Sequence, residues 1–194
     1  LPQLTTGQKL WGFGLTEENA GSDALGTETT AVRDGDHWVI NGAKRFITNA
    51  STPITLGVTL QVKTTDESGQ SRLTTILVER DTPGFKAERM LGKMMWRAAD
   101  TAKLTFDNCR VPYTNLLGKE GQGAKYMLKT LDGGRLSVAA MGLGLAQGAY
   151  ELALKHAKTR VQFGKPIIRN QAISFKLADM DMKLELARNT LYKA

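Results

Sequence analysis

The sequence holds a single cysteine, two histidines and five prolines in 194 residues. One cysteine, Cys109, excludes a disulfide within the chain and is typical of a reducing compartment. Because Cys109 has no histidine near it in the sequence, we predict a structural thiol rather than a nucleophile. His37 and His156 lack the spacing of metal ligands, so no metal site is predicted.

Long apolar runs are also missing. No uninterrupted apolar stretch approaches the ~20 residues that a helix needs to cross a bilayer, although 41% of the residues are hydrophobic and can form a core. The net charge of +7 permits a polyanionic partner such as nucleic acid. Basic and acidic residues are interleaved, however, without a basic run or an aromatic RNA-binding motif. Phosphate groups on a small molecule satisfy the same charge, and nucleic acid is the weaker interpretation.

The first two thirds of the chain have the pattern of many short strands. Asp34-Gly35 predicts a tight hairpin turn, Asn41-Gly42 predicts a second turn, and Pro83-Gly84 breaks the chain again. The strands are expected at residues 11–15, 27–33, 38–40, 44–48, 54–64, 71–79, 102–107 and 109–111. Turn signals every ~8–12 residues favour an antiparallel β-barrel or sandwich. No helical pattern alternates with these strands, which argues against a βαβ sheet.

The last third is helical in pattern. Apolar residues recur at helical spacing from Met127 to Leu154 and again from Ile173 to Leu191, on either side of a predicted loop at residues 163–166. Two antiparallel helices cannot bury their broad apolar faces alone, so we expect an incomplete four-helix bundle. The predicted fold class is therefore α+β, with a β domain at 1–117 and a partial helical-bundle domain at 118–194.

The two ends of the sequence lead to a further expectation. The chain starts at Leu1 without methionine, and its last four residues still follow the helical pattern without a glycine stop. We therefore expect a piece of a longer protein.

One segment, Gly14–Gly26, combines small residues with hydroxyls, an amide and carboxylates. Small residues let the backbone approach a ligand, and N–H groups with Ser and Thr hydroxyls suit phosphate or carbonyl oxygens. Composition alone favours an ordinary loop capped by Asn19, Ser22 and Asp23. The order of the residues, however, resembles the acyl-CoA dehydrogenase signature, in which Thr-Glu leads into Ala-Gly-Ser-Asp. Glu18 stands where most members carry proline, which predicts a looser loop.

A second segment, Lys44–Asn49, is by itself a strand with one aromatic residue in the core. Beside the first motif it resembles the second flavin segment of the family, in which Trp or Phe precedes Ile-Thr. The resemblance implies that the aromatic ring covers one face of the flavin and that the Thr hydroxyl forms a hydrogen bond with its N5 and O4 edge. It also implies that the first motif lies along the pyrimidine side of the ring and near the pyrophosphate. The implied FAD contacts of this half are Phe13, Leu15, Thr16, Ser22, Phe46, Ile47 and Thr48. Glu17 and Asp23 are interpreted as loop-shaping residues.

Leu131–Arg135, near the start of the long helix, is equally compatible with a solvated helix face. The resemblance makes it the segment that meets the acyl thioester and pantetheine. The implied substrate contacts are Ser22, Asp132, Gly133, Gly134 and Arg135. In the isovaleryl type the glutamate base occupies the position of Gly134, so that type is disfavoured. The base of the straight-chain type is expected beyond Ala194, which leaves no catalytic residue in this chain and predicts that the chain alone is inactive.

Arg160–Gly164 resembles the Arg-x-x-Phe-Gly loop of the family. The guanidinium group of arginine can form two parallel hydrogen bonds to phosphate oxygens, and an aromatic ring can stack on adenine. The alternative is an ordinary loop at the end of a helix, with the arginine side chain in solvent and no ligand. The resemblance implies that this loop reaches the FAD of a neighbouring subunit. The residues concerned are Arg160, Gln162, Phe163, Asn170 and Gln171. The segment 97–112 resembles the next strand pair of the family, and we give it no catalytic role.

The implied activity is the FAD-dependent α,β-dehydrogenation of acyl-CoA thioesters in fatty acid β-oxidation. The resemblance also implies an electron-transferring flavoprotein as electron acceptor, a homodimer or homotetramer, and a bacterial cytoplasmic or mitochondrial matrix location. Two alternatives remain open at this point. One is an acyl-CoA oxidase or flavin monooxygenase of the same fold, which uses oxygen, and the other is a non-catalytic binding or assembly module.

Overall fold

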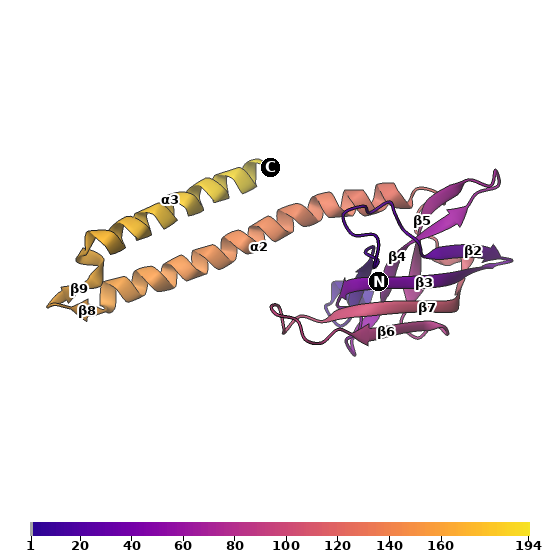
Figure 1. Ribbon diagram of the computed structural model, residues 1–194, viewed down its shortest axis with the longest axis horizontal. Coiled ribbons are helices and arrows are strands. Elements are labelled where there is room, and N and C mark those ends of the chain that lie inside the picture. The colour runs from indigo at the N-terminus through magenta and orange to yellow at the C-terminus, as the bar shows by residue number, and fades with distance from the viewer. Residues whose placement is uncertain (1) are drawn as a thin grey trace. The chain divides into compact units, whose positions relative to one another are not determined.

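A computed structural model describes residues 2–194 (Figure 1). The chain divides into two compact units, which meet in sequence between Leu128 and Lys129. The first unit is built mainly from strands and the second from helices. Within the described residues, no helix is both long and apolar enough to cross a membrane.

The first unit contains a seven-stranded mixed sheet. Its strand order is β1-β4-β2-β3-β7-β6, and β5 also pairs with β4. The unit opens with a short helix, and a 3-10 helix follows the last strand. The elements are α1 (Pro2–Thr5), β1 (Leu10–Gly14), β2 (Thr30–Asp34), β3 (His37–Thr48), β4 (Thr55–Thr65), β5 (Ser71–Glu79), β6 (Phe85–Arg89), β7 (Thr101–Pro112) and η1 (Tyr113–Asn115).

The prediction of an antiparallel barrel is wrong for this sheet. β1 runs parallel to β4, and β2 meets β4 in parallel at Thr30 and Lys63. Within residues 2–194, no pairing joins β5 to β6, so the sheet does not close on itself. Short turns force neighbouring strands to be antiparallel, but a long connection lets the chain cross to a parallel neighbour. The loop at residues 15–29 is such a connection, and its length lets β2 lie parallel to β4.

β3 is longer and more irregular than predicted. The hairpin between β2 and β3 forms, with Asp34 opposite His37, so Gly35 and Asp36 make its turn. Asn41-Gly42 is not a turn, because β3 continues through it with a shift in its pairing to β7. Gly42 has a φ of 141°, and a Cβ there would lie 2.7 Å from the Cα of Thr29. A glycine lets the loop before β2 cross β3 at this point.

The core of the first unit is formed by the inward residues of β3, β4, β5 and β7. Trp38 is fully buried and stacks on Tyr113, with ring centroids 5.3 Å apart. Cys109 is buried among these side chains, as expected for a structural thiol. Complete burial of one large apolar side chain stabilises a fold by roughly 1.5–3 kcal/mol. The other members of this core are Ala31, Ile40, Ile47, Ala50, Val58, Leu60, Val62, Ile76, Val78, Ala102, Leu104, Phe106 and Val111.

The second unit is a pair of antiparallel helices (Figure 1). The helix α2 (Gly123–Thr159) begins in the first unit and continues without a break through Gly133-Gly134. The predicted loop at 163–166 is a small hairpin. The remaining elements are β8 (Val161–Gln162), β9 (Lys165–Pro166), η2 (Ile167–Arg169) and α3 (Gln171–Lys193).

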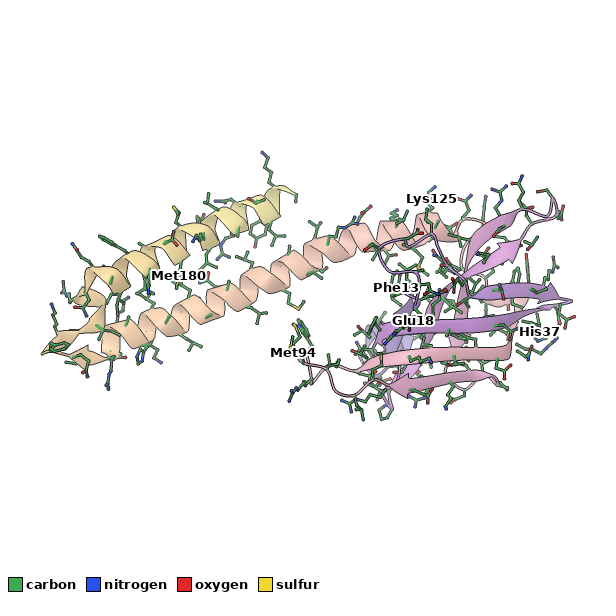
Figure 2. The ribbon with its side chains drawn as sticks, in the orientation of Figure 1. Phe13, Glu18, His37, Met94, Lys125 and Met180 are labelled. Carbon is green, nitrogen blue, oxygen red and sulfur yellow. The ribbon has the colours of Figure 1, made fainter. Side chains whose placement is uncertain are left out.

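An apolar groove separates the two helices of the second unit. It has a volume of about 1050 Å³ and is lined by small residues of α2, among them Gly142 and Ala146, and by Leu184 and Ala187 of α3. Met180, labelled in Figure 2, lies on the same groove. A hydrogen bond of 2.8 Å from Arg188 to Gln147 ties the helices together. The helices leave much of their apolar surface exposed, as the sequence pattern predicted.

Candidate functional site

The two motif segments of the first unit lie side by side. After Gly14 the chain leaves β4 and runs along β3, where the N–H of Arg45 donates to the carbonyl of Thr16 over 2.8 Å. Just before this point, Gly12 lets β1 pack closely on β4, since a Cβ there would lie 2.8 Å from the side chain of Val58. The sheet therefore brings the Thr-Glu motif next to the Phe-Ile-Thr motif. Figure 2 shows Phe13 and Glu18 toward one end of the sheet and His37 at the opposite end.

Phe46 occupies a bulge in β3. The pairing with β7 shifts between Lys44 and Ile47, and Phe46 has a φ of 60°, in the left-handed region that disfavours large side chains. Its ring is 56% exposed, and the Arg45 guanidinium lies 4.9 Å from the ring centroid. The bulge thus turns an aromatic ring outward from a strand that would otherwise alternate. The alternative prediction, a core aromatic, is wrong.

The other predicted flavin contacts of this unit differ in exposure. Leu15 and Ile47 are buried, Phe13 and Thr16 are half-buried, and Ser22 and Thr48 are exposed. Among residues 2–194, the hydroxyls of Thr16, Ser22 and Thr48 make no recorded hydrogen bond, which leaves them available to a ligand. The first unit therefore presents three hydroxyl groups and one aromatic ring from two adjoining segments.

The predicted capping of the Gly14–Gly26 loop is found in part. Asp23 Oδ1 accepts the N–H of Leu25 over 3.3 Å, and Asn19 donates to Glu28 at 3.4–3.5 Å. The stronger support comes from outside the loop. Gln61 of β4 is buried and donates to the carbonyl of Ala24 and to the hydroxyl of Thr27, at 2.7 and 2.8 Å. β4 therefore holds the second half of the loop.

A buried ion pair holds the first half. Lys44 Nζ lies 2.7 Å from Glu17 Oε1 and 3.1 Å from the carbonyl of Leu15. The Glu17 carboxylate also accepts the N–H groups of Glu28 and Thr29, at 2.7 and 3.1 Å. Both side chains are almost fully enclosed. The interpretation of Glu17 as a loop-shaping residue agrees with these contacts.

The pKa values of the pair follow from this environment. Burial alone would raise the pKa of Glu17, but the Lys44 hydrogen bond and charge, with the N–H of Glu28, outweigh it, so that this pKa lies below its ordinary value. Burial lowers the pKa of Lys44, and Glu17 offsets part of that effect. Glu17 is therefore an ionised carboxylate whose charge is balanced by its partner.

The sequence pattern did not point to Lys44 or Gln61. Both are polar residues within strands, at positions that face the interior. A buried lysine in a strand needs a counter-charge, and the nearest candidate in the other motif is Glu17. That reasoning could have indicated the pair in advance.

The predicted substrate segment lies on the exposed surface of α2. Arg135 and Asp132 form an ion pair one turn apart, and both side chains are more than two thirds exposed. Gly133 and Gly134 have open space where a Cβ would stand. These four residues are all exposed within the second unit. Because they follow one another along the helix, they do not all lie on the same face.

The Arg-x-x-Phe-Gly loop forms the tip of the β8–β9 hairpin. Phe163 and Gly164 both have positive φ values, 51° and 73°, as a tight hairpin turn requires. The Phe163 ring is 97% exposed. Arg160 precedes the hairpin, and its carbonyl accepts the N–H of Ile167 over 2.9 Å. An exposed aromatic ring in a strained turn is poorly explained by folding alone.

Asn170 and Gln171 follow this hairpin at the start of α3. The carbonyl of Asn170 accepts the N–H groups of Ile173 and Ser174, and its side chain makes no capping hydrogen bond. Gln162, within β8, is exposed, and its side chain bonds the neighbouring carbonyl of Val161. These predicted contacts therefore gather around one hairpin of the second unit.

No described group of side chains resembles a metal site. A cavity of about 870 Å³ in the first unit is lined by Arg33, Trp38, Asp66 and Glu120, among others, and contains none of the predicted flavin contacts. The residues of the two motifs nevertheless fit a flavin by their chemistry. They combine an outward aromatic ring with hydroxyl donors, and the one buried carboxylate beside them is neutralised by Lys44.

Comparison with known families matches both units. The family described as "Acyl-CoA dehydrogenase, middle domain" matches residues 12–109, and "Acyl-CoA dehydrogenase, C-terminal domain" matches residues 121–194. Together these matches cover the strands of the sheet from β1 into β7 and nearly all of the helical part.

Curated relatives and solved structures give the same result. The probable acyl-CoA dehydrogenase YngJ of Bacillus subtilis (strain 168) is 48% identical over all of this chain and 51% of its own length. The short-chain specific acyl-CoA dehydrogenase of Megasphaera elsdenii is 45% identical over all of this chain and 50% of its length. The solved butyryl-CoA dehydrogenase from Megasphaera elsdenii is 44% identical, with a TM-score of 0.90 over 98% of this chain and 50% of that one. The chain thus spans about half the length of these relatives.

Proposed function

The chain belongs to the acyl-CoA dehydrogenase family, and we propose that it forms the flavin-facing part of an enzyme that desaturates acyl-CoA thioesters between the α and β carbons. Members of this family are FAD-dependent oxidoreductases. The observation that carries the proposal is the hydrogen bond between the Arg45 N–H and the Thr16 carbonyl. It joins the two segments whose residues are proposed to bind one flavin.

We propose a role for each residue of the site. The Phe46 ring covers one face of the flavin, and the Thr16 and Thr48 hydroxyls donate hydrogen bonds to its polar edge. Phe13, Leu15 and Ile47 enclose the ring, and Ser22 contacts the pyrophosphate and the substrate. FAD, when bound, accepts the hydride that leaves the β carbon. Fixed donors at the edge where negative charge develops favour this reaction.

The substrate is proposed to be a short-chain acyl-CoA thioester. The relatives named for short-chain and butyryl substrates support this choice. Asp132, Gly133, Gly134 and Arg135 are proposed to face the thioester and pantetheine, and the two glycines leave space there. The base that removes the α proton is assigned to no residue of this chain.

The domain boundary is proposed at residues 117/118, where the β part gives way to the helical part. We propose that α2 and α3 are two helices of a four-helix bundle, because the groove between them is lined mainly by apolar side chains. Arg160, Gln162, Phe163, Asn170 and Gln171 are proposed to contact the FAD of a neighbouring subunit in a dimer or tetramer. The exposed Phe163 ring is available to stack on adenine.

Electrons are proposed to leave for an electron-transferring flavoprotein. The enzyme is proposed to act in fatty acid β-oxidation, in the bacterial cytoplasm or the mitochondrial matrix. The net charge of +7 suits a cofactor and a substrate that both carry phosphate groups.

The test uses the protein at the full length of its relatives. We expect a yellow protein whose flavin absorption is bleached by butyryl-CoA without oxygen and restored by an electron-transferring flavoprotein. The 194-residue chain alone should give no turnover, because none of its residues is proposed as the base. Consumption of oxygen in place of the carrier would indicate an oxidase or monooxygenase. A colourless full-length protein would contradict the proposal and favour a binding module.

A further inference from the structure

We propose that Glu17 and Lys44 are a positioning pair, which holds the Thr16 segment against the Phe46 bulge in the register that a flavin requires. This inference rests on the function proposed above. Neither residue is assigned a contact with the cofactor. They act through the backbone of the residues that lie between them and the site.

The contacts of the pair give it this role. Lys44 Nζ reaches the carbonyl of Leu15 and the carboxylate of Glu17, at 3.1 and 2.7 Å. The next residue of β3, Arg45, donates its N–H to the carbonyl of Thr16 over 2.8 Å. Two successive residues of β3 therefore hold three successive residues of the motif loop. Thr16 lies in the middle of these three.

Lys44 is also the last regular residue before the bulge. It lies opposite Leu104 of β7, and the next regular pair is Ile47 with Ala102. Phe46 stands in the shifted segment between them with its left-handed φ. An anchor just before an irregular segment fixes where the irregularity begins. The same anchor thus sets the positions of both Thr16 and Phe46.

Glu17 also contacts the far end of the loop. Its carboxylate accepts the N–H groups of Glu28 and Thr29, at 2.7 and 3.1 Å, immediately before β2. Glu17 is 5% exposed and Lys44 is 1% exposed, so water does not compete for these contacts. One buried carboxylate joins the start of the loop, its end and β3.

Stability alone is a weak reason for such a pair. Removing two charges from water costs about as much as their attraction returns, and apolar replacements of buried pairs are often neutral or stabilising. Directional contacts, in contrast, specify geometry that apolar packing leaves loose. Charge balance is a second advantage, because an unpaired carboxylate beside an anionic reduced flavin would oppose the reaction.

The main test compares two variants of the full-length protein loaded with FAD. E17Q/K44M removes both charges together, which avoids an unpaired buried charge, so we expect it to fold. Its flavin absorption bands should shift and its FAD affinity should fall about 10- to 100-fold, the size of effect seen when groups that orient metal ligands are removed. Thermal unfolding, the visible spectrum and FAD titration are measured for each variant.

The matched control is E18Q. Glu18 pairs with Arg45, so this ion pair joins the same two segments, but Glu18 is largely exposed. Its removal should leave the spectrum and the FAD affinity unchanged. An equal effect from E18Q and E17Q/K44M would show that any change in these segments disturbs the flavin, and it would overturn the special role of the buried pair.

A second variant covers the case in which E17Q/K44M does not fold. E17D keeps the charge and shortens the side chain by one methylene, so the pair remains but pulls the loop toward β3. It should fold and shift the flavin spectrum. Folded E17D or E17Q/K44M with the wild-type spectrum and FAD affinity would overturn the positioning role alone. Wild-type protein that binds no FAD would overturn the proposed function and this inference together.

Discussion

The Arg45 N–H and the Thr16 carbonyl are 2.8 Å apart and join two segments that are distant in sequence. Their hydrogen bond is not part of a regular strand pair, because β1 pairs with β4 rather than with β3. It forms where the motif loop passes the bulge of β3. The candidate flavin surface is therefore built from two irregular segments held against each other.

Phe46 is predicted to be a residue whose conformation serves binding rather than folding. Its left-handed φ costs of order 1–3 kcal/mol in a non-glycine residue. Phe46→Gly relieves that cost but gives up the buried part of a side chain that is 56% exposed, so the free energy of unfolding should stay within about 1 kcal/mol of its original value. FAD affinity should fall in the same variant. Denaturant unfolding and FAD titration of the full-length protein measure the two effects.

Asn49→Gly is the control for Phe46→Gly. Asn49 also has a left-handed φ, 57°, but asparagine tolerates this region, so its replacement should change stability by only a few tenths of a kcal/mol. A large loss of stability in Phe46→Gly would mean that the ring supports the fold, and the interpretation of the bulge would be wrong.

Gly12 is predicted to be needed for the close packing of β1 on β4. A Cβ at this position would lie 2.8 Å from Val58 and 3.4 Å from Ile47, both in the core. Gly12→Ala should therefore lower the free energy of unfolding by about 1–3 kcal/mol through overpacking. Gly21→Ala is the control, since a Cβ there meets nothing within 4 Å. Equal stabilities of the two variants would show that β1 can shift freely.

The sequence could predict the elements that depend on local signals. The hairpin at Asp34, the strand Ser71–Glu79 and the helix α3 were confirmed, because turn residues and periodicity determine them. The strand β6 was missed, since its five residues include three charged ones and show no apolar alternation. Asn41-Gly42 has the composition of a turn, but pairing with β7 keeps it inside β3.

Of the candidate site, the sequence could predict the motif residues but not how they are brought together. Thr16 and Phe46 could be named from the sequence, but the hydrogen bond that joins their two segments depends on the parallel pairing of β1, which no local signal indicates. The same holds for Lys44 and Glu17, whose ion pair joins a residue within β3 to the loop that precedes β2. Long-range pairing of polar groups follows from topology, and topology was the least predictable feature of this chain.

The thiol of Cys109 is predicted to be unreactive in the folded protein. Burial raises its pKa from an ordinary 9.0 to about 11. Because the folded pKa is the higher one, this group contributes stability that is complete below pH 9.0 and is lost as the pH rises through about 11. Iodoacetamide at pH 8 should modify Cys109 only after denaturant is added. In Cys109→Ala the corresponding fall in stability above pH 9.0 should disappear, and rapid labelling of the native protein would contradict the burial of the thiol.

Leu184 is predicted to hold the two helices of the second unit together. It lines the groove between α2 and α3 and is 7% exposed, whereas Met182 on the same helix lies off the groove and is 54% exposed. Leu184→Ala removes packed apolar atoms and should lower the free energy of unfolding by about 2 kcal/mol or more, and Met182→Ala should change it by about 0.5 kcal/mol at most. Circular dichroism at 222 nm during thermal unfolding reports the loss of these helices. If the two variants melt at the same temperature, α3 does not pack on α2 through the face that carries Leu184.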